Sequence, residues 1–196
     1  MRIELEQGAF LILHEAWLPV AFAEALRAEL EAELTWEQRT VQLFGRALLQ
    51  PRLIAWCGEA PYRYSGQTLE PRGWTPAAQR ARELVRQSTQ CEFNHLLANL
   101  YRDGNDSMGF HSDNEHELGP TPQVASVSFG ATRRFRIKPR KSGQAHTLDL
   151  AHNSLLLMAG TTQAHYVHGV PKQPEIRASR LNLTFRHVVA GGARRS

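Results

Sequence analysis

Between residues 93 and 188, polar and apolar residues alternate in a series of short segments, and this pattern limits the fold more than any other. In the most regular segment, 180–186, Arg, Asn, Thr and Arg alternate with Leu, Leu and Phe. Successive side chains of an extended chain point to opposite faces, so each segment of this kind predicts one strand. Turn residues separate the other expected strands, which are 93–101, 124–130, 134–138, 146–150 and 154–158.

Two helices are expected ahead of these strands. After a short strand around residues 10–13, Phe22, Leu26 and Leu30 form one apolar stripe on a charged helix. Thr75 is a capping residue and Pro76 suits the first helical position, so a second helix is expected to run to about residue 87. Many short strands behind two helices predict a mostly β protein with flanking helices, either an antiparallel sandwich or a jelly roll.

Length and composition exclude several other classes. A chain of 196 residues with 42% hydrophobic and 21% charged residues can bury one core, and no window approaches the ~18 apolar residues of a membrane span. The acidic N-terminus does not resemble a secretory signal, and two cysteines fit a reduced compartment. We therefore expect a protein of the cytoplasm or nucleoid, or of the nucleus in a eukaryote, with no membrane partner.

Charge divides the chain into an acidic end and a basic body. Residues 1–40 carry three Arg and eight Glu, whereas the remaining residues have 20 basic and 11 acidic groups. The densest basic cluster is 133–141, where Arg134, Arg136 and Lys138 share one strand face. This distribution favours a polyanionic partner, although a merely solvated edge strand would have a similar sequence.

His111 and Asp113 are the first residues that could carry chemistry. In an extended segment, residues i and i+2 point to the same side, so the imidazole and the carboxylate converge. A distant histidine, His165 or His168, would complete two histidines and one carboxylate, a set that leaves positions open at Fe(II). Alone, the pair would more often be a hydrogen-bonded surface pair.

The polar face of segment 180–186 requires a partner if it points into a small sandwich. Buried, unpaired guanidinium groups are costly, and the forked Arg180 and Arg186 side chains suit a small dicarboxylate. Asn99 and Tyr101 form another i, i+2 pair that could bind the same acid. The alternative is an outer face whose arginines form salt bridges with a neighbouring strand.

Taken in order, Asn99-x-Tyr101, His111-x-Asp113, His168 and segment 180–186 resemble the AlkB family of Fe(II)- and 2-oxoglutarate-dependent dioxygenases. Segments 101–104 and 124–130 also resemble AlkB-type nucleic-acid demethylases, and the resemblance covers about residues 40–190. It implies a double-stranded β-helix, a variant of the jelly roll, that uses Fe(II), 2-oxoglutarate and O2. The iron ligands it implies are His111, Asp113 and His168, and the cofactor-binding residues are Asn99, Tyr101, Arg180, Thr184 and Arg186.

The resemblance also implies a lid that presents an extruded base. Tyr64 would stack on the base opposite His111, with Tyr62 and Arg63 lining the lid, although the same residues fit an ordinary strand. Leu43 and Phe44 would form an apolar wedge with Gly45 and Arg46, unless they are simply a hydrophobic strand end. Related duplex-acting members have two acidic residues where this chain has Asn114 and Glu115. Because Asn donates as well as accepts, this exchange changes the hydrogen bonds offered to a methylated base.

The implied activity is oxidative removal of alkyl groups from bases such as 1-methyladenine and 3-methylcytosine in DNA, duplex or single-stranded, by a monomer. An RNA or tRNA demethylase or hydroxylase, a catalytically silent nucleic-acid-binding module and a zinc hydrolase are the alternatives. We expect an N-terminal extension at 1–40 and a dioxygenase domain at 41–190, with a lid at about 41–92 and a jelly roll at about 93–190. A disordered tail is expected at 191–196.

Overall fold

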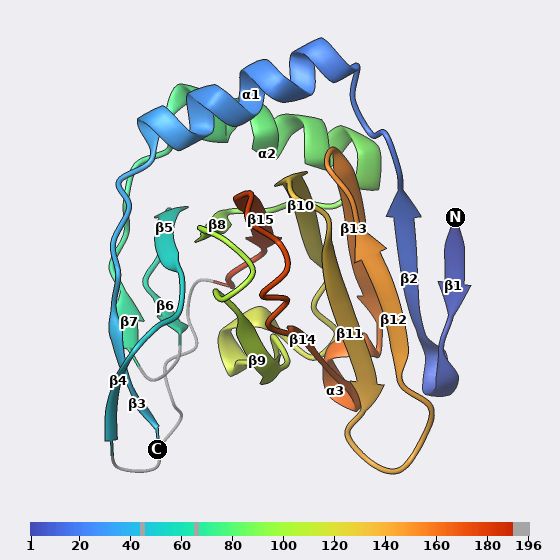
Figure 1. Cartoon of the computed structure of the whole chain (residues 1–196). Coiled ribbons are helices and arrows are strands. Elements are labelled where there is room, and N and C mark those ends of the chain that lie inside the picture. The colour runs from blue at the N-terminus through green and yellow to red at the C-terminus, as the bar shows by residue number, and fades with distance from the viewer. Residues whose placement is uncertain (44–45, 65–66, 190–196) are drawn as a thin grey trace.

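The computed structural model describes residues 1–43, 46–64 and 67–189 (Figure 1). Its helices are α1 (Val20–Glu33), α2 (Pro76–Thr89) and α3 (Thr162–His165), with short 3-10 turns at Glu6–Gly8 and His116–Leu118. The strands are β1 (Arg2–Glu4), β2 (Ala9–His14), β3 (Thr40–Leu43), β4 (Arg46–Leu49), β5 (Leu53–Gly58), β6 (Tyr62–Tyr64), β7 (Gln67–Leu69), β8 (His95–Tyr101), β9 (Met108–His111), β10 (Val124–Gly130), β11 (Arg133–Pro139), β12 (His146–Leu150), β13 (Ser154–Gly160), β14 (Tyr166–Val170) and β15 (Arg180–Arg186).

Two antiparallel sheets face each other. The major sheet has the order β1-β2-β13-β10-β15-β8-β5, and the minor sheet has the order β12-β11-β14-β9. Leu156 and Met158 of the major sheet belong to one buried cluster with Phe135 and Ile137 of the minor sheet. This is the predicted jelly roll, and all six strands expected between residues 93 and 188 are present.

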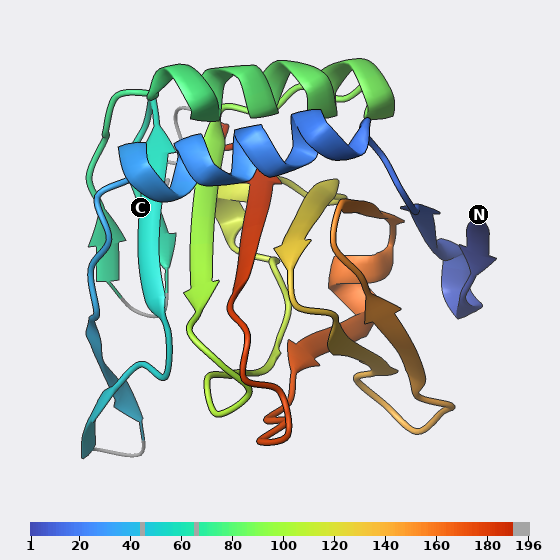
Figure 2. The ribbon, with the colours of Figure 1, turned by 45° about the horizontal axis from the view of Figure 1, so that its top comes forward.

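Both long helices cover the outer face of the major sheet (Figure 2). Leu26 and Leu30 of α1 lie in the same cluster as Leu181 and Leu183 of β15, because the apolar residues of β15 point toward the helices. The side chain of Thr75 accepts a hydrogen bond from the Ala78 amide, which is the predicted cap of α2.

Phe22 corrects the expected apolar stripe of α1, because its side chain is 43% exposed. Ala23, Leu26 and Leu30 are the residues of α1 that are buried. Spacing of four residues fits a helix face only approximately, and the smaller Ala23 lies closer to the centre of that face than Phe22.

The first forty residues are continuous with the two-sheet core. Strand β2 pairs with β13 from His14↔Leu155 to Ala9↔Gly160, so it extends the major sheet. Helix α1 contacts α2 and lies on the same sheet. The acidic amphipathic helix therefore packs on the jelly roll.

Two hairpins, β3–β4 and β6–β7, lie beside the β5 end of the major sheet (Figure 1). Tyr62 and Leu69 of the second hairpin share a buried cluster with Ile54 and Trp56 of β5. In the part of the chain that the structure describes, no helix is long and apolar enough to cross a membrane. The expected disordered tail at 191–196 lies outside the described residues.

Candidate metal centre and cofactor pocket

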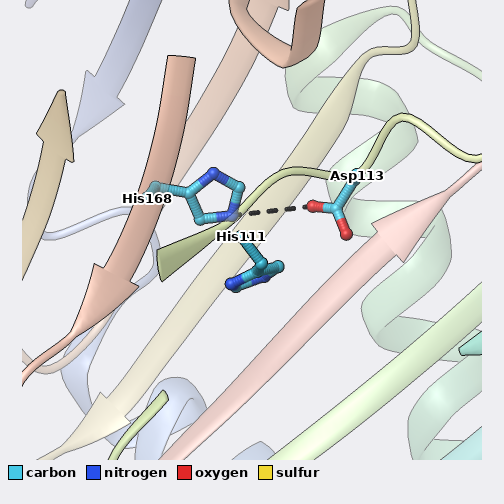
Figure 3. Close-up of side chains that lie close together, drawn as sticks. All are labelled: His111, Asp113 and His168. Atoms are coloured by element: carbon cyan, nitrogen blue, oxygen red, sulfur yellow. Dashed lines mark ion pairs between the residues drawn. The ribbon is translucent and has the colours of Figure 1, made fainter. Parts of the chain in front are cut away.

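His111, Asp113 and His168 converge between the two sheets. His111 ends β9 and lies opposite His168 of β14 in the strand register, while Asp113 follows two residues after His111. The candidate ligand atoms of the three residues all lie within 4.8 Å of one another. In Figure 3 both imidazoles and the carboxylate point to one place, and His168 Nε2 lies 3.6 Å from Asp113 Oδ2.

The protonation of these groups suits a cation. Burial opposes ionisation of Asp113, but the Arg186 guanidinium and the imidazoles of His111 and His168 together outweigh it and lower the pKa to about 2. Burial lowers the pKa of His168 to about 3, which leaves the imidazole neutral with a lone pair. His111 Nδ1 lies 3.0 Å from the Gly109 carbonyl oxygen, so its hydrogen bond leaves Nε2 free to face a metal.

One oxygen of Asp113 is held while the other is left for a ligand. Asp113 Oδ1 accepts two hydrogen bonds from Arg186, and the Asp113 amide donates to Gln163 Oε1 at 3.0 Å. Asp113 Oδ2 is buried and has no hydrogen-bond partner among the described residues. Asp113 Oδ2 is thus a buried carboxylate oxygen that faces two imidazoles and receives no hydrogen bond. A divalent metal would supply the missing positive partner, so the residues fit iron.

A cavity beside the triad is lined by both sheets. Its polar lining comes mainly from β8 and β15, which are paired with Asn182 opposite Asn99 and Arg180 opposite Tyr101. The complete described lining is Asn99, Tyr101, Met108, His111, Asp113, Ser126, Phe135, Met158, His168, Gly169, Val170, Arg180, Asn182, Thr184 and Arg186. The polar face of β15 therefore points inward, and the alternative of an outer, solvated face is wrong.

Arg180 is a buried cation of this cavity with no ion pair among the described residues. Its side chain is 1% exposed, Nη2 donates to Ser128 Oγ at 2.8 Å, and Nε and Nη1 have no partner among the described residues. Burial lowers the pKa of Arg180 to about 10, which still leaves it charged at neutral pH. A buried guanidinium with free donors calls for an anionic ligand.

The remaining polar residues of the cavity form a fixed network. Asn182 Nδ2 donates to Ser126 Oγ at 2.8 Å, and Thr184 Oγ1 donates to Asn182 Oδ1 at 3.1 Å. Asn99 Oδ1 accepts a hydrogen bond from Arg52 Nε at 2.7 Å. Arg52 is 4% exposed and holds the Asn99 amide from inside the fold, so it is buried away from any nucleic-acid strand.

Tyr62 and Glu115 lie on the lid side of Asp113. Tyr62 is fully buried, its ring packs on His95 at 4.6 Å, and the Arg186 guanidinium lies 5.5 Å from the ring centroid. Burial raises the pKa of the Glu115 carboxyl, and the Asp113 carboxylate acts in the same direction. Asn114 is exposed, so of the two neighbours only Glu115 turns inward.

Several expected lid residues lie outside the described residues. The structure does not describe Phe44 and Gly45, nor the side chains of Leu43, Arg46, Arg63 and Tyr64. The roles assigned to these six residues therefore stay predictions.

The sequence did not predict several buried residues that contact the site residues. The sequence around Gln163, His95 and Arg52 does not indicate that these residues are buried at the site. Arg133 belongs to the basic cluster, but it is buried and donates to the carbonyl oxygens of Asp103, Asp106 and Pro171. Its odd position in the alternation of β11 could have placed it on the buried face with Phe135.

Two histidines and one carboxylate at one end of a jelly roll, beside a buried arginine, define the class of mononuclear non-haem iron oxygenases. Residues 10–186 match the model of the 2OG-Fe(II) oxygenase superfamily, and the chain belongs to that family. Its cofactors are therefore Fe(II), 2-oxoglutarate and O2. The match begins within the segment 1–40 that the resemblance left out.

Relatives place the chain among the AlkB-type members. It is 40% identical to human alpha-ketoglutarate-dependent dioxygenase alkB homolog 3 over 186 residues, covering 90% of this chain and 65% of the relative. It is 40% identical to mouse DNA oxidative demethylase ALKBH2 over 182 residues, covering 86% of this chain and 76% of the relative. The chain thus spans slightly less than two thirds of the length of the alkB homolog 3 relatives.

The solved structure of OsALKBH1 has the same fold. It aligns with a TM-score of 0.64 over 94% of this chain and 100% of that chain, at 17% identity. This likeness supports the jelly-roll architecture alone.

Proposed function

We propose that this chain oxidatively removes alkyl groups from N-alkylated bases in DNA, with 1-methyladenine and 3-methylcytosine as substrates. The observation that carries the proposal is the unpartnered Asp113 Oδ2 between two imidazoles, next to an inward-facing arginine with free donors. The name of the mouse relative, DNA oxidative demethylase, supports DNA as the substrate.

In this proposal His111, Asp113 and His168 hold the iron. Fe(II) bound there would allow O2 to oxidise 2-oxoglutarate to succinate and CO2 with one oxygen atom and to hydroxylate the base methyl with the other. The hydroxymethyl group would then leave as formaldehyde. The protein supplies no nucleophile, and its residues supply geometry. Arg186 keeps Asp113 ionised and directs Oδ2 toward His168.

The cavity residues would bind the co-substrate. Arg180 offers two unpartnered donors to the distal carboxylate, which would replace the missing counter-charge in the cavity. Tyr101, Asn99 and Thr184 add polar atoms to the same cavity, and Arg52 fixes the orientation of the Asn99 amide. Arg186 lies at the end of the cavity nearest the triad.

The base would enter on the lid side of the triad. Glu115 and the Tyr62 hydroxyl interact with each other here, and neither the Tyr62 hydroxyl nor Glu115 Oε2 forms a short hydrogen bond with the described residues. These oxygens are suited to meet the polar edge of an extruded base. We further propose that Tyr64 stacks on that base, and that Leu43, Phe44, Gly45 and Arg46 wedge the duplex.

We propose that the chain acts as a monomer in the compartment that holds the DNA, which is the cytoplasm or nucleoid, or the nucleus of a eukaryote. Its net charge of +4 favours a polyanion. RNA is the competing substrate, since an RNA demethylase would keep every iron and cofactor residue and differ only in the lid and the basic surface. Matched DNA and RNA oligonucleotides that carry the same methylated base separate the two.

The test is anaerobic reconstitution with Fe(II), followed by assay of 3-methylcytosine in single- and double-stranded DNA, with and without 2-oxoglutarate. Mass spectrometry of the base should show loss of the methyl group only when 2-oxoglutarate is present. Asp113→Ala should abolish turnover while sparing DNA binding. Undiminished turnover by this variant would refute the assignment of Asp113 as an iron ligand. Turnover of RNA alone would refute DNA as the substrate.

A further inference from the structure

An exposed aromatic side chain lies next to the metal centre on the opposite face of the same strand. Phe110 precedes His111 in β9, and its side chain is 44% exposed whereas His111 turns toward His168. Strand β9 is the edge of the minor sheet, as its place in Figure 1 shows. Phe110 therefore marks the outer face of the sheet at the rim of the site.

Two cations accompany this ring. Lys138 Nζ lies 4.5 Å from the centroid of the Phe110 ring, and Arg136 Cζ lies 5.8 Å from it. Both side chains project from β11, whose exposed residues alternate with buried Phe135 and Ile137. Neither Lys138 nor Arg136 forms an ion pair with any residue that the structure describes. These cations are thus available to an anion.

Phe110 also lines a groove of about 490 Å³ on the same outer face. No acidic side chain belongs to its described lining, whose charged residues are Lys138, Arg140 and Lys141. Arg140 donates a hydrogen bond to the hydroxyl of Ser112, between His111 and Asp113. The groove therefore runs from the basic loop after β11 to the segment that carries the triad.

An exposed aromatic ring in a positively charged groove is the combination that binds single-stranded nucleic acid, because bases stack on the ring and cations follow the phosphates. We propose that Phe110 is a stacking platform for the unpaired nucleotide next to the lesion in single-stranded DNA, with its phosphates held by Lys138 and the adjoining basic groove. This inference rests on the proposed function and adds a contact that the site makes with single-stranded DNA only. In a duplex the neighbouring base remains paired and stacked, so the ring has no partner.

The test is the affinity of the full chain, loaded anaerobically with Fe(II), for three unmodified probes: a twelve-nucleotide oligothymidine, a strand of the same length without bases, and a blunt duplex. Phe110→Ala should weaken binding of the oligothymidine by about fivefold or more, the loss expected from one base–aromatic stack. It should leave affinity for the base-free strand and the duplex within about twofold. Phe110→Trp should restore binding.

A matched control tests whether the effect is specific to Phe110 or follows from removal of any exposed phenylalanine. Phe22 on α1 is 43% exposed, nearly the same as Phe110, so Phe22→Ala should leave all three affinities unchanged. Lys138→Ala should reduce the slope of log affinity against log salt by about 0.7 on the single strand, whereas Phe110→Ala should not. Lys172→Ala, at an exposed lysine outside the groove, is the charge control and should leave that slope unchanged.

Equal losses on the oligothymidine and the base-free strand, or equal losses on single strand and duplex, would overturn the platform. No change on Phe110→Ala in an enzyme that demethylates 3-methylcytosine would refute the platform and leave the proposed function intact. A selective loss on the oligothymidine in a protein that demethylates no DNA would refute the proposed function instead.

Discussion

Arg186 Nη2 lies 2.7 Å from Asp113 Oδ1, and Arg186 Nε donates to the same oxygen at 3.0 Å. Both side chains are 2% exposed, so the ion pair is almost completely removed from solvent. It joins the last residue of β15 in the major sheet to the segment after β9 in the minor sheet. This contact links the two sheets next to the triad and directs the free oxygen of Asp113 toward His168.

Arg186→Met tests this contact. Removal of one partner leaves a buried unpaired carboxylate, which typically lowers the free energy of unfolding by about 3–5 kcal/mol. The pKa of Asp113 should rise because the guanidinium that lowers it is gone, and Fe(II) affinity at neutral pH should fall. Urea unfolding of the metal-free chain and anaerobic Fe(II) titration measure the two effects.

The matched control is the double variant Asp113→Asn with Arg186→Met. It removes both charges and should recover much of the lost stability while still failing to bind Fe(II). A single variant that unfolds within 1 kcal/mol of the wild-type chain would contradict an important role for the pair.

Arg180→Met should weaken 2-oxoglutarate binding selectively. Hydrogen bonds to charged groups contribute about 1.5–3 kcal/mol, so the dissociation constant should rise by about 10- to 150-fold. Isothermal titration with 2-oxoglutarate under anaerobic conditions measures the loss, and Fe(II) affinity should stay within about twofold because Arg180 is not one of the three candidate ligands.

The same substitution has an opposite effect on the ligand-free chain. Arg180 is buried with no counter-ion among the residues that the structure describes, so Met should raise the free energy of unfolding in the absence of 2-oxoglutarate. A variant that binds 2-oxoglutarate normally, or one destabilised without ligand, would argue against Arg180 as the carboxylate-binding residue.

Much of the catalytic half could be predicted from sequence because its pattern has a direct geometric meaning. The alternation in 180–186 gives both the strand and the shared face of Arg180 and Arg186, and the i, i+2 spacing brings His111 and Asp113 together. The choice of His168 rested on family resemblance, because spacing alone left His165 open. In the structure His168, not His165, belongs to the cluster.

The supporting residues could not be predicted because their partners are distant in sequence. Arg52 contacts Asn99 across 47 positions, and the Asp113 amide contacts Gln163 across 50 positions. The residues around Arg52 do not show that it is buried, because an arginine after a proline in a polar loop could as well be exposed. Strands β4, β5 and β7 were missed, and β3 and β6 entered only as alternatives to lid residues, for a similar reason: these strands are short, and their pairing is fixed by the major sheet and by hairpins.

Phe44→Ala should impair repair of duplex DNA more than repair of single-stranded DNA. The reason is the sequence resemblance of segment 41–46 to a wedge loop, since a wedge is needed only where a base must be forced out of a stack. Initial rates on 3-methylcytosine in matched duplex and single strands measure the ratio. Equal losses on both would count against the wedge, and Phe110→Ala provides the contrasting variant because its loss is expected on single strands.

His95→Phe should raise the free energy of unfolding and make it depend less on pH below about 6.5. His95 is 1% exposed, and both ring nitrogens lack a hydrogen-bond partner among the described residues. Leaving such groups unsatisfied costs about 1–3 kcal/mol, whereas phenylalanine would keep the ring contact with Tyr62 without that cost. The gain is expected at pH 7.5 in urea unfolding of the metal-free chain.

The pH dependence follows from the direction of the pKa shift. Burial lowers the pKa of His95 to about 3, with Arg186 acting in the same direction, whereas an unfolded histidine titrates near 6.5. Between these values the unfolded chain binds a proton that the folded chain excludes, so the free energy of unfolding falls as pH decreases below about 6.5. His95→Phe should lose about 1.4 kcal/mol less than wild type between pH 7.5 and 5.5. Parallel stability curves for the two proteins would show that His95 accepts a proton in the folded state, and hence that its ring nitrogens have a partner there.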